Sequence, residues 1–183
     1  CDKKGSLDGA ATGTTILTSS KFGRARWFDG VDDTVTVSSA STLGGIANLS
    51  FEFWFNAKSG WDSWDTLIEG DSGASWYCQF NTTSQLYCNV KNASDANGVV
   101  ISDSAITADI WHHAVVTYNG SNVNLYVDGI LADATAASQT GNVRSVSSFY
   151  LGSNAGSGAY YKGNIDEVRV YSSALSASTI IDH

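Results

Sequence analysis

Apolar and polar residues alternate most regularly through residues 111–129, where two alternating runs flank a polar turn at Asn119 and Gly120. This pattern predicts a β-hairpin. A two-residue loop would pair Val116 with Val123, whereas a four-residue loop would pair Val116 with Leu125. With either loop the side chains divide between two faces in the same way. One face carries Ala114, Val116, Val123, Leu125 and Val127, and the other carries His113, Val115, Thr117, Asn122, Asn124 and Tyr126. Asp128 and Gly129 then predict a second tight turn.

Shorter runs of the same kind recur along the chain between Gly-, Ser- and Asn-rich turns. Residues 49–55 are the clearest, with Leu49 and three phenylalanines on one face. Further strands are expected at 14–17, 26–28, 34–38, 66–69, 99–101, 148–152 and 164–171, with a hairpin around Cys78 and Cys88. Ser176 is the expected N-cap of one short helical turn. The spacing predicts an all-β fold, a two-sheet antiparallel sandwich that forms one domain.

The composition argues against two classes of binding partner. The 183 residues carry a net charge of −8, and the ten Lys and Arg are scattered, which disfavours nucleic acid and anionic membranes. No apolar stretch approaches the roughly 18 residues needed to cross a bilayer, so membrane insertion is not expected. The absence of Met favours a chain that begins after processing.

The three cysteines indicate whether the protein occupies an oxidising or a reducing compartment. A hairpin centred near Thr83 places Phe80 opposite Leu86 and Cys78 opposite Cys88, a register that suits a cross-strand disulfide and an oxidising compartment. The alternative is a pair of buried free thiols. Cys1 is left over, and is consistent with a truncated remnant, an intermolecular partner or a lipid-bearing residue.

Five segments in succession resemble the concanavalin A-like jelly-roll domains of the laminin G and pentraxin type. They read GRARWFDGVDDTVTV, LSFEFWFNA, WHHAVVTYNGSNVNLYVDG, FYLGS and YKGNIDEVRVYSSALSASTI. The resemblance covers nearly the whole of residues 1–183 and implies a single laminin G-like jelly roll from a family dominated by extracellular glycan-binding, adhesion and accessory domains, often with calcium. Only CDKKG precedes the SLDGAATG-like turn, so an upstream first strand or segment is expected to be missing. The resulting open sheet edge would invite strand addition from another chain.

Catalysis is not expected. Related jelly-roll glycanases place two carboxylates on one strand face four residues apart, and no predicted strand here has that spacing. Asp166 and Glu167 are adjacent and therefore on opposite faces, while Glu52 has no acidic partner at neighbouring even positions. His112 and His113 lie within a strand, where structural packing is the simpler interpretation.

Metal binding rests on one acidic turn. Asp29, Asp32 and Asp33 lie close together, and carboxylate oxygens suit Ca²⁺. Asp166 shares a predicted strand face with Val168 and Val170, and in a core it would need a cation or several backbone N–H groups. One structural Ca²⁺ that links Asp166 to this turn is the hypothesis, and a merely solvated turn is the alternative.

Glycan binding follows from aromatic rings and polar groups in loops, because sugars stack their CH faces on rings and pair their hydroxyls with amides and carboxylates. The candidate ligand-binding residues are Trp61, Trp64, Asp71, Trp76, Asn154, Tyr160 and Tyr161, with Asp62 and Asp65 beside them. The alternative is that the rings cap the ends of the sandwich. Glycosylation sequons occur at Asn48, Asn81, Asn92 and Asn119.

These observations favour a non-catalytic extracellular recognition or adhesion module, secreted or at the cell surface, that binds a glycan or a cell-surface protein. A structural subunit of a filament assembled by strand exchange is the alternative, and a glycoside hydrolase is a distant third.

Overall fold

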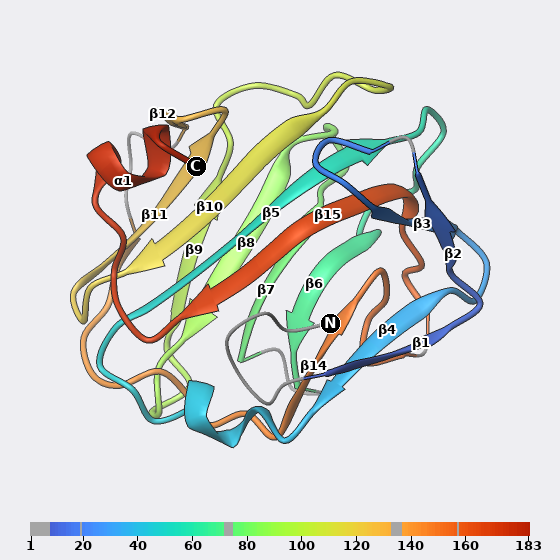
Figure 1. Cartoon of the computed structure of the whole chain (residues 1–183). Coiled ribbons are helices and arrows are strands. Elements are labelled where there is room, and N and C mark those ends of the chain that lie inside the picture. Colours follow the sequence, from blue (N-terminus) through green and yellow to red (C-terminus); the bar gives the residue numbers. More distant parts are fainter. Residues whose placement is uncertain (1–7, 19, 72–74, 133–136, 157) are drawn as a thin grey trace.

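The computed structural model describes residues 8–18, 20–71, 75–132, 137–156 and 158–183. Within them, two antiparallel sheets pack face to face, and Figure 1 looks onto the eight-stranded sheet with the seven-stranded sheet behind it. Strand order is β1-β4-β14-β6-β7-β8-β9 in one sheet and β12-β11-β10-β5-β15-β3-β2 in the other, where β13 pairs with β11. The predicted all-β jelly-roll sandwich is confirmed.

The seven-stranded sheet contains β1 (Gly9–Thr12), β4 (Thr34–Ser38), β6 (Thr66–Gly70), β7 (Trp76–Phe80), β8 (Leu86–Lys91), β9 (Asn97–Ile101) and β14 (Ser148–Leu151). The eight-stranded sheet contains β2 (Thr15–Leu17), β3 (Ala25–Asp29), β5 (Leu49–Ala57), β10 (His112–Tyr118), β11 (Asn122–Val127), β12 (Ile130–Leu131), β13 (Ala137–Ser138) and β15 (Lys162–Tyr171). The helical segments of the described chain are η1 (Ala40–Leu43) and α1 (Ala177–Ile181). None of these helices is long and apolar enough to cross a membrane.

The hairpin of β10 and β11 has the register predicted for a four-residue loop. Val116 pairs with Leu125, and Tyr118 pairs with Val123 on either side of the loop. The predicted core face is confirmed, because Ala114, Val116, Val123 and Leu125 are fully buried and Val127 packs against the same cluster. Four alternate residues of β5 complete this layer of the core: Leu49, Phe51, Phe53 and Phe55.

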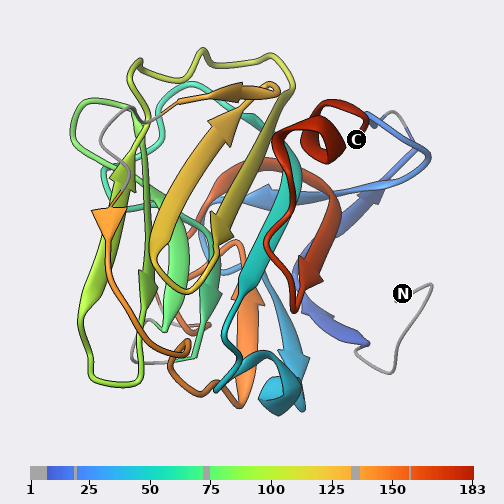
Figure 2. The same ribbon diagram turned by 90° about the vertical axis from the view of Figure 1, so that its left-hand side faces the viewer.

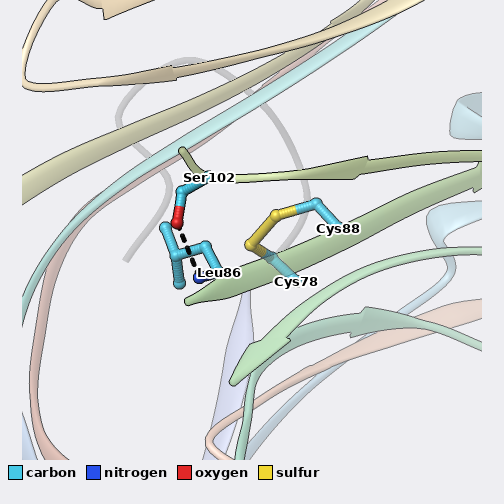
Figure 3. The surroundings of a disulfide bond; sticks show 4 residues. All are labelled: Cys78, Leu86, Cys88 and Ser102. Carbon is cyan, nitrogen blue, oxygen red and sulfur yellow. Dashed lines mark hydrogen bonds between the residues drawn. A yellow bond between two sulfur atoms is a disulfide. The ribbon is translucent and has the colours of Figure 1, made fainter. Parts of the chain in front are cut away.

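The predicted cross-strand disulfide joins Cys78 of β7 to Cys88 of β8 (Figure 3). Phe80 lies opposite Leu86 in the same ladder, as expected. Figure 3 also shows the Leu86 N–H donating to the Ser102 hydroxyl at 3.1 Å, at the point where β9 ends. Both sulfur-bearing side chains are fully buried, so the disulfide defines the core side of this hairpin. Cys1 lies outside the described residues.

The C-terminal segment covers part of the outer face of the eight-stranded sheet. Figure 2 shows α1 on that side of β5, and Ser176 caps it by accepting from the Thr179 N–H, as predicted. Beneath it, the fully buried Glu52 carboxylate accepts hydrogen bonds from Arg169 (2.9 Å), Tyr171 (2.8 Å) and His183 (2.9 Å). Burial alone would raise the pKa of Glu52, but these bonds and the nearby His113 lower it to about 2.

Two local features differ from the sequence-based expectation. Residues 9–12 form an edge strand, β1, beside β4, although they were expected to be loop; all four residues are exposed, so no apolar alternation marks them. In β15 a β-bulge at Glu167 interrupts the alternation. Asp166 therefore pairs with Trp54 on the outer face, whereas Val170 pairs with core Phe51. The prediction that Asp166 shares a face with Val168 and Val170 is wrong, because both valines pack against the core.

Candidate functional site

Two of the loops expected to carry function meet the acidic turn at one end of the sandwich. Residues from the segments 60–65 and 159–162, together with Gly30 of the acidic turn, surround a depression of about 240 Å³. Its lining is strongly polar and comprises Gly30, Gly60, Asp62, Ser63, Asp65, Ala159, Tyr160 and Lys162. The structure thereby brings together residues that lie far apart in the sequence, from Gly30 to Lys162.

Backbone hydrogen bonds hold these loops against each other. The Thr66 N–H donates to the Ala159 carbonyl at 2.9 Å, and the Lys58 N–H donates to the Lys162 carbonyl at 3.0 Å. Gly30 has a φ of +85°, and a Cβ on it would meet the Lys162 side chain at 3.0 Å. Glycine is therefore suited to this turn for two reasons: it adopts the left-handed backbone without strain, and it leaves room for the Lys162 side chain.

Two carboxyl groups dominate the electrostatics of the depression. Asp65 is buried, and its Oδ2 accepts from the Asp62 N–H at 3.0 Å. Burial raises the pKa of Asp65 to about 6, the Asp62 N–H partly offsets this, and the Asp62 charge adds to the rise. Asp62 itself is exposed, and Lys162 is another of the lining residues. The site thus offers hydrogen-bond donors and acceptors of both charges, which suits a hydroxyl-rich ligand.

Trp64 lies in the sequence between the lining residues Ser63 and Asp65, and its ring meets Tyr87 edge-on with centroids 5.9 Å apart. It is 44% exposed and has a φ of +80°, a left-handed conformation that is rare for a bulky side chain. The Trp64 N–H donates to the Phe80 carbonyl at 2.7 Å, and its carbonyl accepts from the Thr66 hydroxyl at 3.1 Å. Backbone strain of this kind concentrates at ligand sites, where surrounding bonds maintain it.

Three of the aromatic residues predicted to bind ligand are less exposed than Trp64. Trp76 and Tyr161 are fully buried in the core, so a sugar cannot stack on them. Trp61 is half-buried and stacks on Phe80 with ring centroids 4.7 Å apart, which is the capping role weighed as the alternative. The Trp76 ring packs against Phe51, because Trp76 begins strand β7 on its core-facing side.

The other predicted ligand-binding residues are divided between two places. Tyr160 lines the depression and donates its hydroxyl to the Gly156 carbonyl at 3.4 Å. Asn154 is exposed in the same loop. Asp71 follows the opposite end of β6, where its carboxylate accepts from the Ser147 N–H and hydroxyl, so it braces a different loop.

The acidic turn supplies only some of the oxygen ligands that a Ca²⁺ site requires. Carboxylate oxygens of Asp29, Asp32 and Asp33 lie within 4.8 Å of one another. Two of these groups already accept backbone hydrogen bonds inside the turn, with Asp33 bound to the Asp29 N–H and Asp29 bound to the Val31 N–H. Ca²⁺ takes six to eight oxygen ligands, so three carboxylates would supply only part of a site. Calcium binding stays a prediction.

The structure does not bring Asp166 to that turn. Asp29 pairs with Lys162 on β15, and Asp166 lies four residues further along the strand. Its carboxylate accepts from the Phe22 N–H at 3.0 Å and the Glu167 N–H at 2.9 Å. Burial raises its pKa, and these backbone bonds partly offset the rise. Backbone N–H groups, the second of the two partners considered, therefore satisfy this acid.

The paired histidines of β10 make structural contacts. His112 Nδ1 lies 2.7 Å from Asp128 Oδ2 across the tight turn that follows β11. The His113 ring stacks on Trp54 with centroids 4.9 Å apart. Both side chains are buried, which agrees with the packing role expected for them.

The four sequons differ in accessibility. Asn92 is buried, and its Nδ2, the atom that would carry a glycan, donates to the Thr140 carbonyl at 2.7 Å. Asn119 is exposed in the hairpin loop, while Asn48 and Asn81 are half-buried. Glycosylation at any of them stays a prediction.

Sequence reasoning missed Ser63 and Lys162 as lining residues. Lys162 begins a strand and has no local motif, so only its pairing with Asp29 and its approach to Gly30 place it in the site. Ser63 lies between the tryptophans of the loop, and that position is the one signal that would have found it.

Comparison with known proteins gives a family match. The family model described as the concanavalin A-like lectin/glucanases superfamily matches residues 29–181. No curated protein matches this sequence.

Solved structures give the same fold. One is domain 4 of AbnA, a GH43 extracellular arabinanase from Geobacillus stearothermophilus, in complex with arabinotriose; identity is 19%, coverage is 95% of this chain and 86% of that one, and the TM-score is 0.75. Another is the binding domain of Paraclostridial Mosquitocidal Protein 1, at 15% identity, 96% and 46% coverage and a TM-score of 0.77. A third is the ligand binding domain of Botulinum neurotoxin serotype D in complex with N-acetylneuraminic acid, at 15% identity, 96% and 45% coverage and a TM-score of 0.73. This chain therefore spans less than half of either toxin domain.

Proposed function

The chain belongs to the concanavalin A-like lectin/glucanases superfamily, and from this premise we propose that it is a non-catalytic glycan-recognition module whose ligand binds at the depression beside Trp64. The observation that carries the proposal is an exposed tryptophan with a positive φ whose neighbours in the sequence, Ser63 and Asp65, line a pocket together with Asp62, Tyr160 and Lys162. An aromatic face beside directional polar groups is the combination that sugar rings require.

The solved structures support the ligand class. Domain 4 of the arabinanase was solved with arabinotriose, and the serotype D toxin domain with N-acetylneuraminic acid. At identities of 19% and 15% these likenesses supply candidate ligands to test and do not select one. The Cys78–Cys88 disulfide is consistent with an oxidising compartment, so we place the module outside the cell, secreted or at the cell surface.

A glycan array followed by calorimetry tests the proposal, with arabino-oligosaccharides and sialylated glycans included and every measurement made with and without Ca²⁺. Trp64→Ala and Asp62→Asn are expected to weaken binding at least tenfold, because they remove the ring and the exposed carboxylate. Phe22→Ala is the matched control, since Phe22 is 50% exposed but lies against Trp54 on the other sheet. An array without bound glycan, or wild-type affinity in both site variants, would refute the proposal.

One observation favours a second candidate, self-assembly by strand addition. Strand β1 is at the end of the seven-stranded sheet and pairs only with β4 among the described strands, and all its side chains are exposed. An edge of this kind offers backbone groups to another strand. Size-exclusion chromatography with light scattering would detect polymers, and an Ala11→Pro substitution would dissolve them if β1 is the joining edge. A monodisperse monomer at high concentration would exclude this candidate.

A further inference from the structure

The depression carries an unbalanced negative charge. Two of its lining residues are the aspartates Asp62 and Asp65, and within the part of the chain that the structure describes neither carboxylate takes part in an ion pair. The acidic turn adds further carboxylates beside them, because Gly30 of that turn lines the same depression. Concave surfaces with an excess of one charge attract ligands of the opposite charge.

The lysines at the depression already have acids of their own. Lys162 is the cation among the lining residues, and Asp29 lies directly opposite it in the β3–β15 ladder, where opposite charges attract across the strands. Lys58, whose N–H donates to the Lys162 carbonyl, pairs its own Nζ with Asp109 at 2.8 Å. The two aspartates of the lining are therefore left without a cation.

Asp65 faces the depression although its side chain is deeply buried. The residue is 7% exposed and still belongs to the lining. Its Oδ2 accepts from the Asp62 N–H at 3.0 Å, and among the described residues no donor is bound to Oδ1. A carboxylate in such a position gains most from a donor that is itself positively charged. Oδ1 is thus an acceptor that the fold leaves for a ligand.

The size of the depression and its remaining groups define the rest of the ligand. A volume of about 240 Å³ is smaller than the roughly 300–1,000 Å³ of sites for drug-sized molecules, which suits a single sugar unit. Ser63 and Tyr160 contribute hydroxyl groups that can pair with those of a sugar. A bare Ca²⁺ ion would leave most of this volume unfilled and would require more oxygen ligands than two aspartates offer. A sugar with a positively charged substituent uses both the acids and the hydroxyls.

We propose that the depression recognises an amino sugar whose amine is free and therefore positively charged, such as a unit of a de-N-acetylated glycan. This inference rests on the proposed glycan recognition and deepens it, because it names the class of sugar. The ammonium group would donate to the Asp62 carboxylate and to Asp65 Oδ1, and the ring hydroxyls would pair with Ser63 and Tyr160. An N-acetylated sugar lacks this charge and a sialylated sugar carries the opposite one, so both should bind more weakly.

Calorimetry with sugars of matched shape tests the inference. Glucosamine, galactosamine and mannosamine are compared with their N-acetylated and hydroxyl counterparts, which differ from them only in the group on the second carbon. At least one free amine is expected to bind about tenfold more tightly than both of its counterparts at pH 7. Asp62→Asn and Asp65→Asn are each expected to reduce this preference, and Lys162→Gln is expected to increase it by removing a like charge. Asp103→Asn is the matched control, because Asp103 is exposed and lies outside the lining.

The dependence on pH gives an independent measurement. Burial raises the pKa of Asp65 to about 6, so its carboxylate is lost as the pH falls from 7 to 5. Affinity for the free amine should then fall by up to about tenfold, and the amine itself cannot cause this loss because it gains charge at lower pH. Asp65→Asn should lose this dependence and Asp62→Asn should keep it. Tyr161 stays neutral because burial raises its pKa well above the usual range. The other titratable groups around this position are Asp62, Tyr160, Lys162 and Asp29.

The outcomes separate this inference from the proposed function. Equal affinity for amino, N-acetylated and hydroxyl sugars overturns the inference and leaves glycan recognition standing, as does a preference that Asp103→Asn reduces as much as the site variants do. A preference that disappears when Ca²⁺ is chelated overturns it too, since the metal would then be the charged partner. If no sugar of this panel or of the glycan array binds, the proposed function falls as well. Thermal melts identify misfolded variants, and Asp62→Asn, a change at an exposed residue, decides the question if Asp65→Asn does not fold.

Discussion

Trp64 presents its ring to solvent and is held in a left-handed backbone conformation, so its effect on stability can be measured separately from its proposed effect on glycan binding. A non-glycine residue in that region costs roughly 1–2 kcal/mol, and glycine avoids this cost. Glycine in turn makes the unfolded chain more flexible, which takes back roughly 0.5–1 kcal/mol. We therefore expect Trp64→Gly to be more stable than Trp64→Ala by about 0.5–1 kcal/mol.

The comparison of these two variants removes the ring from both, so the difference between them reports the backbone alone. For a chain of this size, 1 kcal/mol corresponds to roughly 2–4 °C in Tm, and the expected gap is therefore about 2 °C. Differential scanning calorimetry resolves such a gap, and urea unfolding gives the free energy of unfolding independently. Both variants are expected to lose glycan affinity equally.

Trp61 supplies the control within the same loop, because its φ is not positive. There, Trp61→Gly should be less stable than Trp61→Ala by about 0.5–1 kcal/mol, which is the opposite sign. If Trp64→Gly is no more stable than Trp64→Ala, the strain argument is wrong. If either Trp64 variant binds glycan as the wild type does, the ring has no part in recognition.

Three further predictions concern stability. Burial raises the pKa of Glu69 to about 7, so the stabilisation from its protonated form is present below pH 4.5 and is lost as the pH rises through 7. The free energy of unfolding of Glu69→Gln, relative to that of the wild type, should therefore be about 2 kcal/mol higher at pH 8 than at pH 5, as measured by urea unfolding at both pH values. The pKa of Glu52 is lowered to about 2, so the stabilisation from its carboxylate is present above pH 4.5 and is lost as the pH falls through 2. Glu52→Gln should lower the free energy of unfolding by about 3 kcal/mol at pH 6, and its Tm should fall less steeply than that of the wild type as the pH is lowered. The disulfide closes a loop of ten residues, so replacing Cys78 and Cys88 by alanine should lower the free energy of unfolding by about 2–3 kcal/mol, and an unchanged Tm would contradict this.

Much of the fold could be predicted because strands with one buried face carry their own register. In the β10–β11 hairpin a one-residue shift would move all the apolar side chains to the outer face, so the two faces could be predicted, whereas the choice of Leu125 over Val123 as the partner of Val116 depends on the length of the loop. The same rule applies to the disulfide hairpin, where the parity of Cys78 places Trp76 in the core. Trp76 was nevertheless predicted to bind ligand from its position next to a loop, so the parity argument was available and proximity was the weaker guide.

The site resisted prediction for the opposite reason, since its loops have no periodicity and its contacts lie far apart in sequence. A bulge at Glu167 reverses the face of every later residue of β15, and nothing in the local pattern marks it. Nor does the sequence of residues 57–65 distinguish Trp61, which stacks on Phe80, from Trp64, which turns outward; the difference is one left-handed residue held by the Phe80 carbonyl. The exposure of the Trp64 ring thus depends on a backbone conformation that the rest of the fold imposes, and the identity of the side chain alone cannot reveal it.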